Sequence, residues 1–247
     1  MRDDDRVEDL RDDLDRRAQR YERANERISP VSATDRTGTV TVRLDSSGVF
    51  ASVIVTDNWR HELNAAGLAD AVMESFGLAG AERARVWGET VAQVQSDPSP
   101  QTRPVPPLHT TLAGQLQEIA DRDGAPPSEA TVEALHAMIA DIRTGMREVF
   151  GKVETRMHDR LSGTSSSGHV TATVTGSGAL EALEFDERWL ARAHAFNVSR
   201  ECTEAITSGF AKVADPATLA EGTSLERVTR LTKDAEALAA FVRQHER

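Results

Sequence analysis

Five basic residues near the middle of the chain have the type and spacing to contact phosphate groups. Lys152, Arg156 and Arg160 stand four residues apart, and Arg143 and Arg147 lie in the turns before them. Residues four apart share one face of a helix, so the spacing predicts a basic stripe. Such stripes bind nucleic-acid backbones without reading the bases. Acidic residues are interleaved with them, so a solvated face of ion pairs is the alternative interpretation.

A second set of arginines, spaced three or four apart, lies near the start of the chain: Arg16, Arg20, Arg23 and Arg27. Residues 1–30 contain ten acids against eight arginines, and the acids crowd at the beginning. Such a cluster repels a phosphate backbone over a Debye length of about 8–10 Å. We therefore expect any contact with double-stranded DNA to lie in the segment 143–160, with the first segment as a structural partner.

The overall charge favours a different class of partner. The 247 residues include 29 Lys and Arg against 40 Asp and Glu, a formal net charge of -11. An acidic chain is a poor electrostatic match for phosphates, so a protein partner is the alternative to DNA. No apolar run reaches the roughly 18 residues of a membrane span, and the start lacks a signal-peptide pattern. We expect a cytoplasmic protein with no membrane partner.

No catalytic, cofactor or metal residues are predicted. The seven histidines are not paired at metal-ligand spacing, and the sequence has no Walker, HExxH, CxxC or GxSxG motif. The single cysteine, Cys202, lies four residues from both Val198 and Ile206, which indicates a buried thiol on an apolar helical face. We do not expect an enzyme.

Two long helices are predicted from heptad-like spacing of apolar residues. The first covers residues 3–28, and the second runs from the N-cap Ser128 to about residue 161 before a flexible stretch at 164–168. Their seams are Val7, Leu10, Leu14, Arg17, Tyr21, Ala24 and Ile28 in the first helix, and Val132, Leu135, Ile139, Ile142, Met146, Val149, Val153, Met157 and Leu161 in the second. Such seams are typical of helices that pair.

Each long helix precedes a predicted β-hairpin, and the two hairpins repeat each other. Segments 38–59 and 168–189 align without a gap at an offset of 130, which matches Gly38 with Gly168 and Trp59 with Trp189. We interpret this as a tandem duplication, with the tryptophans as packing anchors. A lone hairpin is unstable in water, so the two units should pair as a pseudo-dimer within the chain, and the seam of the first helix could recruit a second chain as a homodimer.

The remaining elements complete an α+β fold of two helix–hairpin–helix units. Helices are expected over about 62–93, interrupted at Gly77 and Gly80, over 190–213, and over 224–244 as a C-terminal amphipathic helix. Seven of the nine prolines fall within 96–127, which indicates a linker. The predicted organisation is a first unit at 1–95, a proline-rich linker at 96–127, a second unit at 128–215 and a C-terminal helix at 216–247.

This order of elements resembles the YbaB/EbfC family of nucleoid-associated proteins. The matching residues are Val40, Thr41, Val42, Leu44, Gly48, Val53, Val55 and Asp57 in the first copy, and Val170, Thr171, Val174, Gly176, Gly178, Leu180, Leu183, Phe185 and Asp186 in the second. The resemblance covers about 3–93 and 128–213. The chain departs from the family pattern in being duplicated and acidic.

The resemblance implies a fold that dimerises through its sheet, projects helical arms and binds DNA without catalysis or much sequence specificity. On that basis Arg143, Arg147, Lys152, Arg156 and Arg160 are the candidate DNA-binding residues, and the protein would lie in the nucleoid. Actinobacterial members also occur as accessory proteins of type VII secretion systems. The alternative function is therefore an acidic protein-interaction module, such as a cytosolic accessory or chaperone of such a system.

Overall fold

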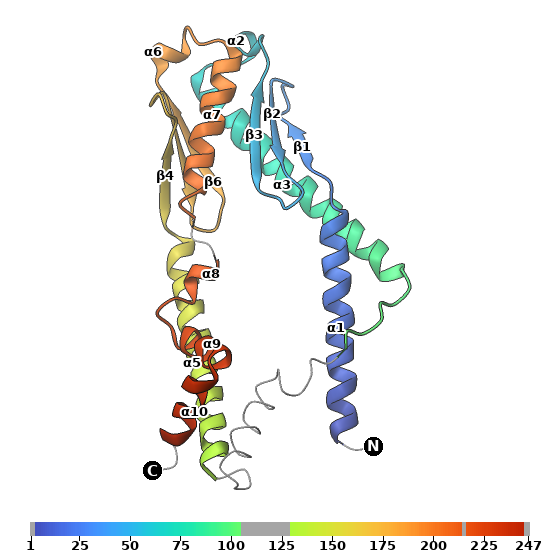
Figure 1. The fold of residues 1–247 in the computed structure, drawn as a ribbon. Helices are drawn as coiled ribbons and strands as arrows, with labels where there is room; N and C mark the ends of the chain where they lie inside the picture. Colours follow the sequence, from blue (N-terminus) through green and yellow to red (C-terminus); the bar gives the residue numbers. More distant parts are fainter. Residues whose placement is uncertain (1–2, 105–128, 214–215, 245–247) are drawn as a thin grey trace. The chain divides into compact units, whose positions relative to one another are not determined.

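The computed structural model describes residues 3–104, 129–213 and 216–244, and these residues form an α+β protein (Figure 1). The first half of the chain contains α1 (Asp3–Arg27), β1 (Val31–Thr34), β2 (Val40–Leu44), β3 (Phe50–Val55), α2 (Trp59–Glu62) and α3 (Ala65–Ser96). The second half contains α5 (Glu129–Met157), β4 (Arg160–Thr164), β5 (Val170–Thr175), β6 (Leu180–Phe185), α6 (Glu187–Leu190), α7 (Ala195–Phe210), α8 (Pro216–Leu219), α9 (Ser224–Lys233) and α10 (Ala235–Gln244).

The two predicted hairpins are equivalent in register. Val40 pairs with Val55 in the first hairpin, and Val170 pairs with Phe185 in the second, each 130 residues further on. The irregularity before Leu44 recurs before Val174. The turn glycines Gly48 and Gly178 both have positive φ, at 87° and 81°, a conformation that side chains with a Cβ rarely adopt. The offset in the sequence therefore corresponds to an offset in structure.

Each sheet has a third strand that the sequence analysis missed. β1 pairs with β2, and β4 pairs with β5, so the strand orders are β1-β2-β3 and β4-β5-β6. The second long helix ends at Met157 rather than near Leu161, and Leu161 pairs instead with Val174. Residues 165–168 are not a flexible helix end but a tight turn, in which the Gly168 amide donates to the Ser165 carbonyl at 2.9 Å.

One apolar core joins the two sheets. The helix α3 packs on β1 and β2 of its own sheet and also on β6, while α7 packs on β4 and β5 and also on β3. Buried side chains from both halves meet there, among them Val42, Leu68, Val174 and Ile206. A three-stranded sheet needs a covered apolar face. The first sheet is covered by α3 and partly by α7, and the second sheet is covered by α7 and partly by α3. A twofold pseudo-dimer relation between the units stays a prediction.

The helix α3 is continuous, although Gly77 and Gly80 were expected to interrupt it. Each glycine in a helix interior costs about 1 kcal/mol relative to Ala. Both are exposed, while Leu68, Val72 and Ala79 on the opposite face are buried in the core. Burial of about 1.5–3 kcal/mol for each large apolar side chain outweighs the cost of the glycines.

Two compact units divide the chain differently from the predicted boundaries. The sheet unit contains Met1–Arg103 and Asp159–Val213, and the helical unit contains Pro104–His158 and Ala214–Arg247. The helix α5 thus belongs with the C-terminal helices rather than with the strands that follow it. Residues 105–128, including most of the expected linker and the proposed cap Ser128, lie outside the described part of the chain.

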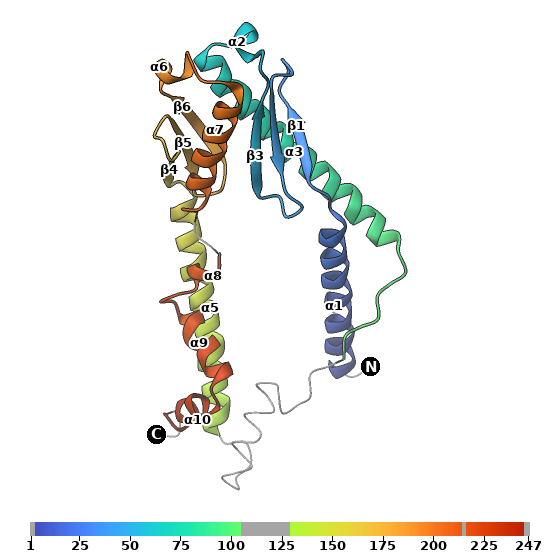
Figure 2. The same cartoon turned by 45° about the horizontal axis from the view of Figure 1, so that its top comes forward.

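In the helical unit, α9 and α10 lie along α5 (Figures 1 and 2). Their core consists of Ala134, Met138, Val228, Leu231, Leu238 and Val242. The expected single helix over 224–244 is two helices, because Asp234 is extended and its carboxylate caps α10 by accepting from the amides of Glu236 at 3.0 Å and Ala237 at 3.1 Å. The C-terminal segment therefore packs back onto the chain.

Candidate functional site

The five predicted DNA-binding residues do not form one stripe. Arg143 and Arg147 share one side of α5, but at 100° per residue Lys152 lies about 180° around the axis from Arg143. Arg156 is on the same side as Lys152. Arg160 is not on the helix at all, because β4 begins there. The prediction of a single helical stripe containing Arg160 was wrong, since the helix ends before it.

Two of the five cations are already engaged. The Lys152 ammonium donates to the carbonyls of Leu219 at 3.3 Å and Glu221 at 2.6 Å, so it binds the C-terminal end of α8. The Arg160 guanidinium forms a bidentate ion pair with Glu181, which raises the pKa of Arg160 above its ordinary value. Arg143, Arg147 and Arg156 remain exposed on α5.

Arg16, Arg20, Arg23 and Arg27 share one face of α1, and several of them contact other residues of the protein. Arg20 donates to the Ser99 hydroxyl at 2.8 Å, and Arg27 forms an ion pair with Asp97 at 2.8 Å. Arg16 lies 3.7 Å from Asp12, one turn earlier. The charge pattern of α1 is therefore used largely within the sheet unit.

The segment after α3 follows α1 through polar contacts that the sequence did not predict. The Gln101 carbonyl accepts from the Gln19 amide at 2.9 Å, and the Arg103 amide donates to the Asp15 carboxylate at 2.7 Å. The backbone bond from Arg103 lowers the pKa of Asp15. Arg103 also forms an ion pair with Glu22. The two residues of each contact lie about 80–90 residues apart in the sequence, so residue spacing could not predict these contacts.

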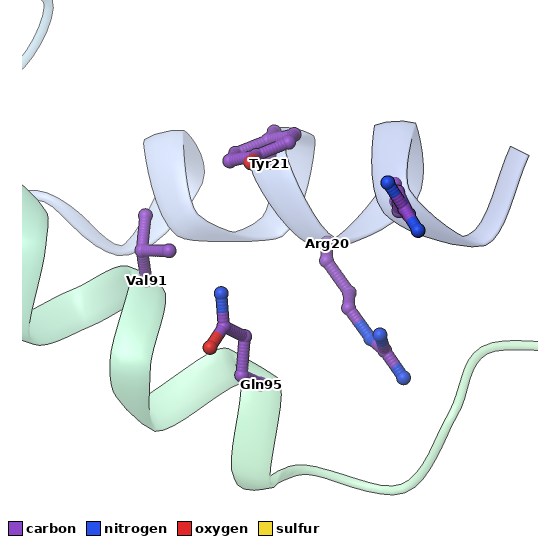
Figure 3. A pocket seen from close by; sticks show the side chains of 5 residues that line it. Arg20, Tyr21, Val91 and Gln95 are labelled. Carbon is purple, nitrogen blue, oxygen red and sulfur yellow. The ribbon is translucent and has the colours of Figure 1, made fainter. Parts of the chain in front are cut away.

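A hollow of about 440 Å³ separates α1 from the end of α3 (Figure 3). Arg17, Arg20, Tyr21, Val91 and Gln95 line it. The Tyr21 ring stacks parallel to Trp87 with their centroids 6.3 Å apart. An aromatic pair with flanking arginines holds α1 against α3 at this level, and Ala24 and Ile28 are buried further along α1.

The most prominent surface feature of the helical unit is an apolar face of α5. Seven large apolar side chains at heptad-like spacing are each 38–62% exposed. We call them the α5 stripe: Val132, Leu135, Ile139, Ile142, Met146, Phe150 and Met157. A neighbouring side of α5, which includes Ala134 and Met138, contacts α9 and α10. The stripe contains six residues of the seam predicted from the sequence and also Phe150, whereas Val149 and Val153 of that seam are half-buried and Leu161 lies in β4.

A shorter face of the same kind lies on α1. Leu10, Leu14 and Tyr21 are 60%, 55% and 48% exposed. We call these three residues the α1 stripe. Tyr21 at one end of this stripe stacks on Trp87 of α3, while Leu10 and Leu14 lie beyond that contact and are more than half exposed.

A third apolar surface lies where α7 covers the edge of β3. The amides of Val53 and Val55 donate to the hydroxyls of Thr203 at 3.0 Å and Ser199 at 2.8 Å, so α7 satisfies the outward donors of an edge strand. The adjoining hollow, about 500 Å³, includes the exposed side chains of Ile54 and Phe196.

Cys202 is fully buried, and burial raises its thiol pKa far above the ordinary value, so it cannot act as a nucleophile near neutral pH. No group of three or more His, Cys, Asp or Glu side chains able to hold a metal ion exists within the described ranges.

Trp59 is buried, and the ring of Trp189 stacks on that of His169 with their centroids 4.9 Å apart, as expected for packing anchors.

The chain matches no protein-family model, and neither the curated proteins nor the solved structures contain a match to it. Among the described helices, none is both long enough and apolar enough to cross a membrane. The candidate surfaces therefore rest on their geometry alone.

Proposed function

We propose that this chain is a non-enzymatic protein-interaction module whose two long helices bind protein partners through the α5 stripe and the α1 stripe. The α5 stripe carries the proposal, because seven large apolar side chains remain 38–62% exposed along one helix. Folded monomers rarely leave so continuous an apolar face in water. A cytosolic accessory or chaperone role, of the kind found beside type VII secretion systems, is one form that this function takes.

The charge of the chain supports the same proposal. A formal net charge of -11 disfavours binding to phosphate groups. The same charge keeps a protein with an exposed apolar stripe soluble before it binds a partner. Because these side chains are already about half buried, covering the rest of one contributes about 1 kcal/mol, so a stable complex needs most of the stripe.

Affinity capture from the source organism's lysate tests the proposal. The tagged chain is compared with Leu14→Asp in the α1 stripe, Ile139→Asp in the α5 stripe and Ala140→Asp as a control. Ala140 is exposed on the same helix but lies outside the stripe. We expect wild type and the control to retain partners that at least one stripe variant loses. Capture of the same proteins by all four chains would contradict the proposal.

DNA binding in the YbaB/EbfC manner is the second candidate, and the exposed guanidinium groups of Arg143, Arg147 and Arg156 favour it. Two of the five predicted phosphate contacts are already engaged, because Lys152 and Arg160 have partners within the chain. A gel shift at low and moderate salt decides between the two. Retardation that weakens steeply with salt and diminishes in Arg143→Ala/Arg147→Ala would support DNA binding. The absence of retardation at micromolar protein and low salt would exclude it.

A further inference from the structure

The α5 stripe has a spacing that reads the same in both directions. With the half-buried Val153 included, the residues of the α5 stripe from Leu135 to Met157 stand at intervals of 4, 3, 4, 4, 3 and 4, and Val149, which is also half-buried, lies beside this series. Met146 is at the centre of this series. An antiparallel helix of the same sequence, centred on Met146, would therefore meet each residue of this series with another member of the series.

We infer that the α5 stripe pairs with the α5 stripe of a second copy of this chain, antiparallel and centred on Met146. This inference rests on the proposed function and names the partner of one of its two surfaces. The twofold axis passes between the two Met146 side chains and makes the contact isologous. The pairs across it are Leu135 with Met157, Ile139 with Val153, and Ile142 with Phe150.

The available area matches what a dimer of this kind requires. If the six side chains of the stripe from Leu135 to Met157 lost their present exposure in both copies, the contact would bury on the order of 1,000 Å² of apolar surface, which is the lower limit for a specific interface. Flanking polar atoms add to this area. A contact of this size predicts association at micromolar concentration rather than an obligate dimer.

The remaining sides of α5 leave this approach open. Met138, Gly145 and Lys152 contact α8, α9 or α10 and lie about 80–120° around the helix axis from Met146, while the stripe beside them stays 38–62% exposed. A second copy can therefore reach the stripe without displacing the C-terminal helices. The same register brings Arg143 beside the second copy's Phe150, where a guanidinium over an aromatic ring is favourable by about 0.5–1 kcal/mol.

The mass of the full chain in solution tests the pairing. Light scattering after gel filtration from about 1 to 100 µM should show wild type shifting from 26.9 kDa towards twice that mass as the concentration rises. Ile139→Asp/Met146→Asp should stay monomeric with unchanged far-ultraviolet circular dichroism, while Ala140→Asp should behave as wild type. A monomer at every concentration, or a dimer that persists in the double variant, would overturn the inference.

Single cysteines test the orientation without disrupting the helix. The native Cys202 is buried, so it does not interfere under mild oxidation. Met146→Cys should form a disulfide-linked dimer on its own, whereas Leu135→Cys and Met157→Cys should crosslink only when mixed with each other. Crosslinking of Leu135→Cys with itself, or failure of Met146→Cys, would overturn the antiparallel register.

The two proposals fail in different ways. A wild-type monomer whose partner capture is lost in Ile139→Asp would refute self-pairing and leave the interaction function standing. A wild-type monomer whose capture is the same as that of every variant would refute both. A dimer that also captures proteins through the α1 stripe would support both.

Discussion

A single carboxylate organises the first turn of each sheet, but it comes from different places. Asp35 follows β1 and accepts from the amides of Thr37, Thr39 and Val40 at 2.7–2.9 Å. The residue 130 positions later is Ser165, whose hydroxyl keeps one of these bonds by accepting from the Val170 amide at 3.2 Å. In the second turn the carboxylate belongs to Glu201 of α7, which accepts from the hydroxyl of Ser167. The second turn is thereby tied to its helix.

Replacement of Asp35 with Ala should lower the free energy of unfolding by about 2–3 kcal/mol, because three amides at a mostly buried site lose their acceptor. Asp45 provides the matched control, since its carboxylate bonds the amides of Ser47 and Val49 in an exposed turn. Asp45→Ala should cost less than about 1 kcal/mol, because water replaces its bonds. Equal losses in urea titrations of the two variants would contradict this explanation.

The ionisation of Glu201 makes part of the stability depend on pH. Burial opposes its ionisation, but bonds from Ser165 and Ser167 and the charge of Arg200 outweigh burial and hold its pKa below the ordinary value. A depressed pKa stabilises the fold above the unfolded value of about 4.3, and this contribution is lost as pH falls through the folded pKa. The urea midpoint should therefore decrease below about pH 4.5, and Glu201→Gln should flatten that decrease. An unchanged slope in this variant would contradict the assignment.

At the scale of elements, glycines set how closely α7 approaches its sheet. A Cβ at Gly163 of β4 would overlap the backbone of Gly209 and the carbonyl of Ala205 in α7. The corresponding residues of the first half, Ala33 and Ala79, carry methyl groups. The helix α7 therefore lies closer to β4 at this point than two such methyl groups would permit.

Gly163→Ala should destabilise the protein by about 1–3 kcal/mol, because the clash is with backbone atoms that cannot rotate away. Gly77→Ala in α3 should have the opposite effect. A Cβ there meets open space, so the helix should gain up to about 1 kcal/mol in free energy of unfolding. Thermal unfolding of both variants measures the difference. A stabilised Gly163→Ala would mean that β4 and α7 are further apart than described.

Elements could be predicted where neighbouring residues in the sequence carry the pattern, and they were missed where only a contact with a distant segment defines them. Alternation and turn glycines located β2, β3, β5 and β6, and the offset of 130 aligned them correctly. The strand β4 was missed because its sequence, RLSGT, alternates weakly and continues the helical seam through Leu161. Only its pairing with β5, a contact made by folding, identifies it as a strand.

The candidate site failed for the same reason. The spacing of Arg143 and Arg147 predicted a shared face correctly, since both lie within one helix. Lys152 and Arg160 were misjudged because their partners, the carbonyls of Leu219 and Glu221 and the carboxylate of Glu181, are 21 to 69 residues away. A charge run shows which side chains could meet a ligand, but not which of them the protein itself neutralises.

At the scale of the whole molecule, the chain alternates between its two units. It leaves the sheet unit after Arg103, returns at Asp159 and leaves again after Val213. Both units are therefore built from segments distant in sequence. The expected boundaries assumed that each unit was continuous, which explains why α5 was assigned to the strands that follow it.

Removal of residues 214–247 should affect only one unit. The tryptophans Trp59 and Trp189 lie in the sheet unit, so their near-ultraviolet circular dichroism should be retained. The face of α5 that contains Ala134 and Met138 would lose its cover, and binding of a hydrophobic dye should increase. Loss of the tryptophan signal would show that the sheet unit depends on the C-terminal helices.

The hydroxyls of Ser199 and Thr203 that accept from the edge of β3 are synthesised much later than β3 itself, so the edge stays uncovered for a time during translation. The amide of Val55 leaves the ribosome 144 residues before the Ser199 hydroxyl that satisfies it. At translation rates of about 5–20 residues per second, the nascent edge strand waits roughly 7–30 s for its cover. Throughout that interval the first sheet presents open backbone donors to neighbouring nascent chains. Recombinant expression at a reduced rate of initiation, which spaces ribosomes further apart, should therefore raise the yield of folded protein.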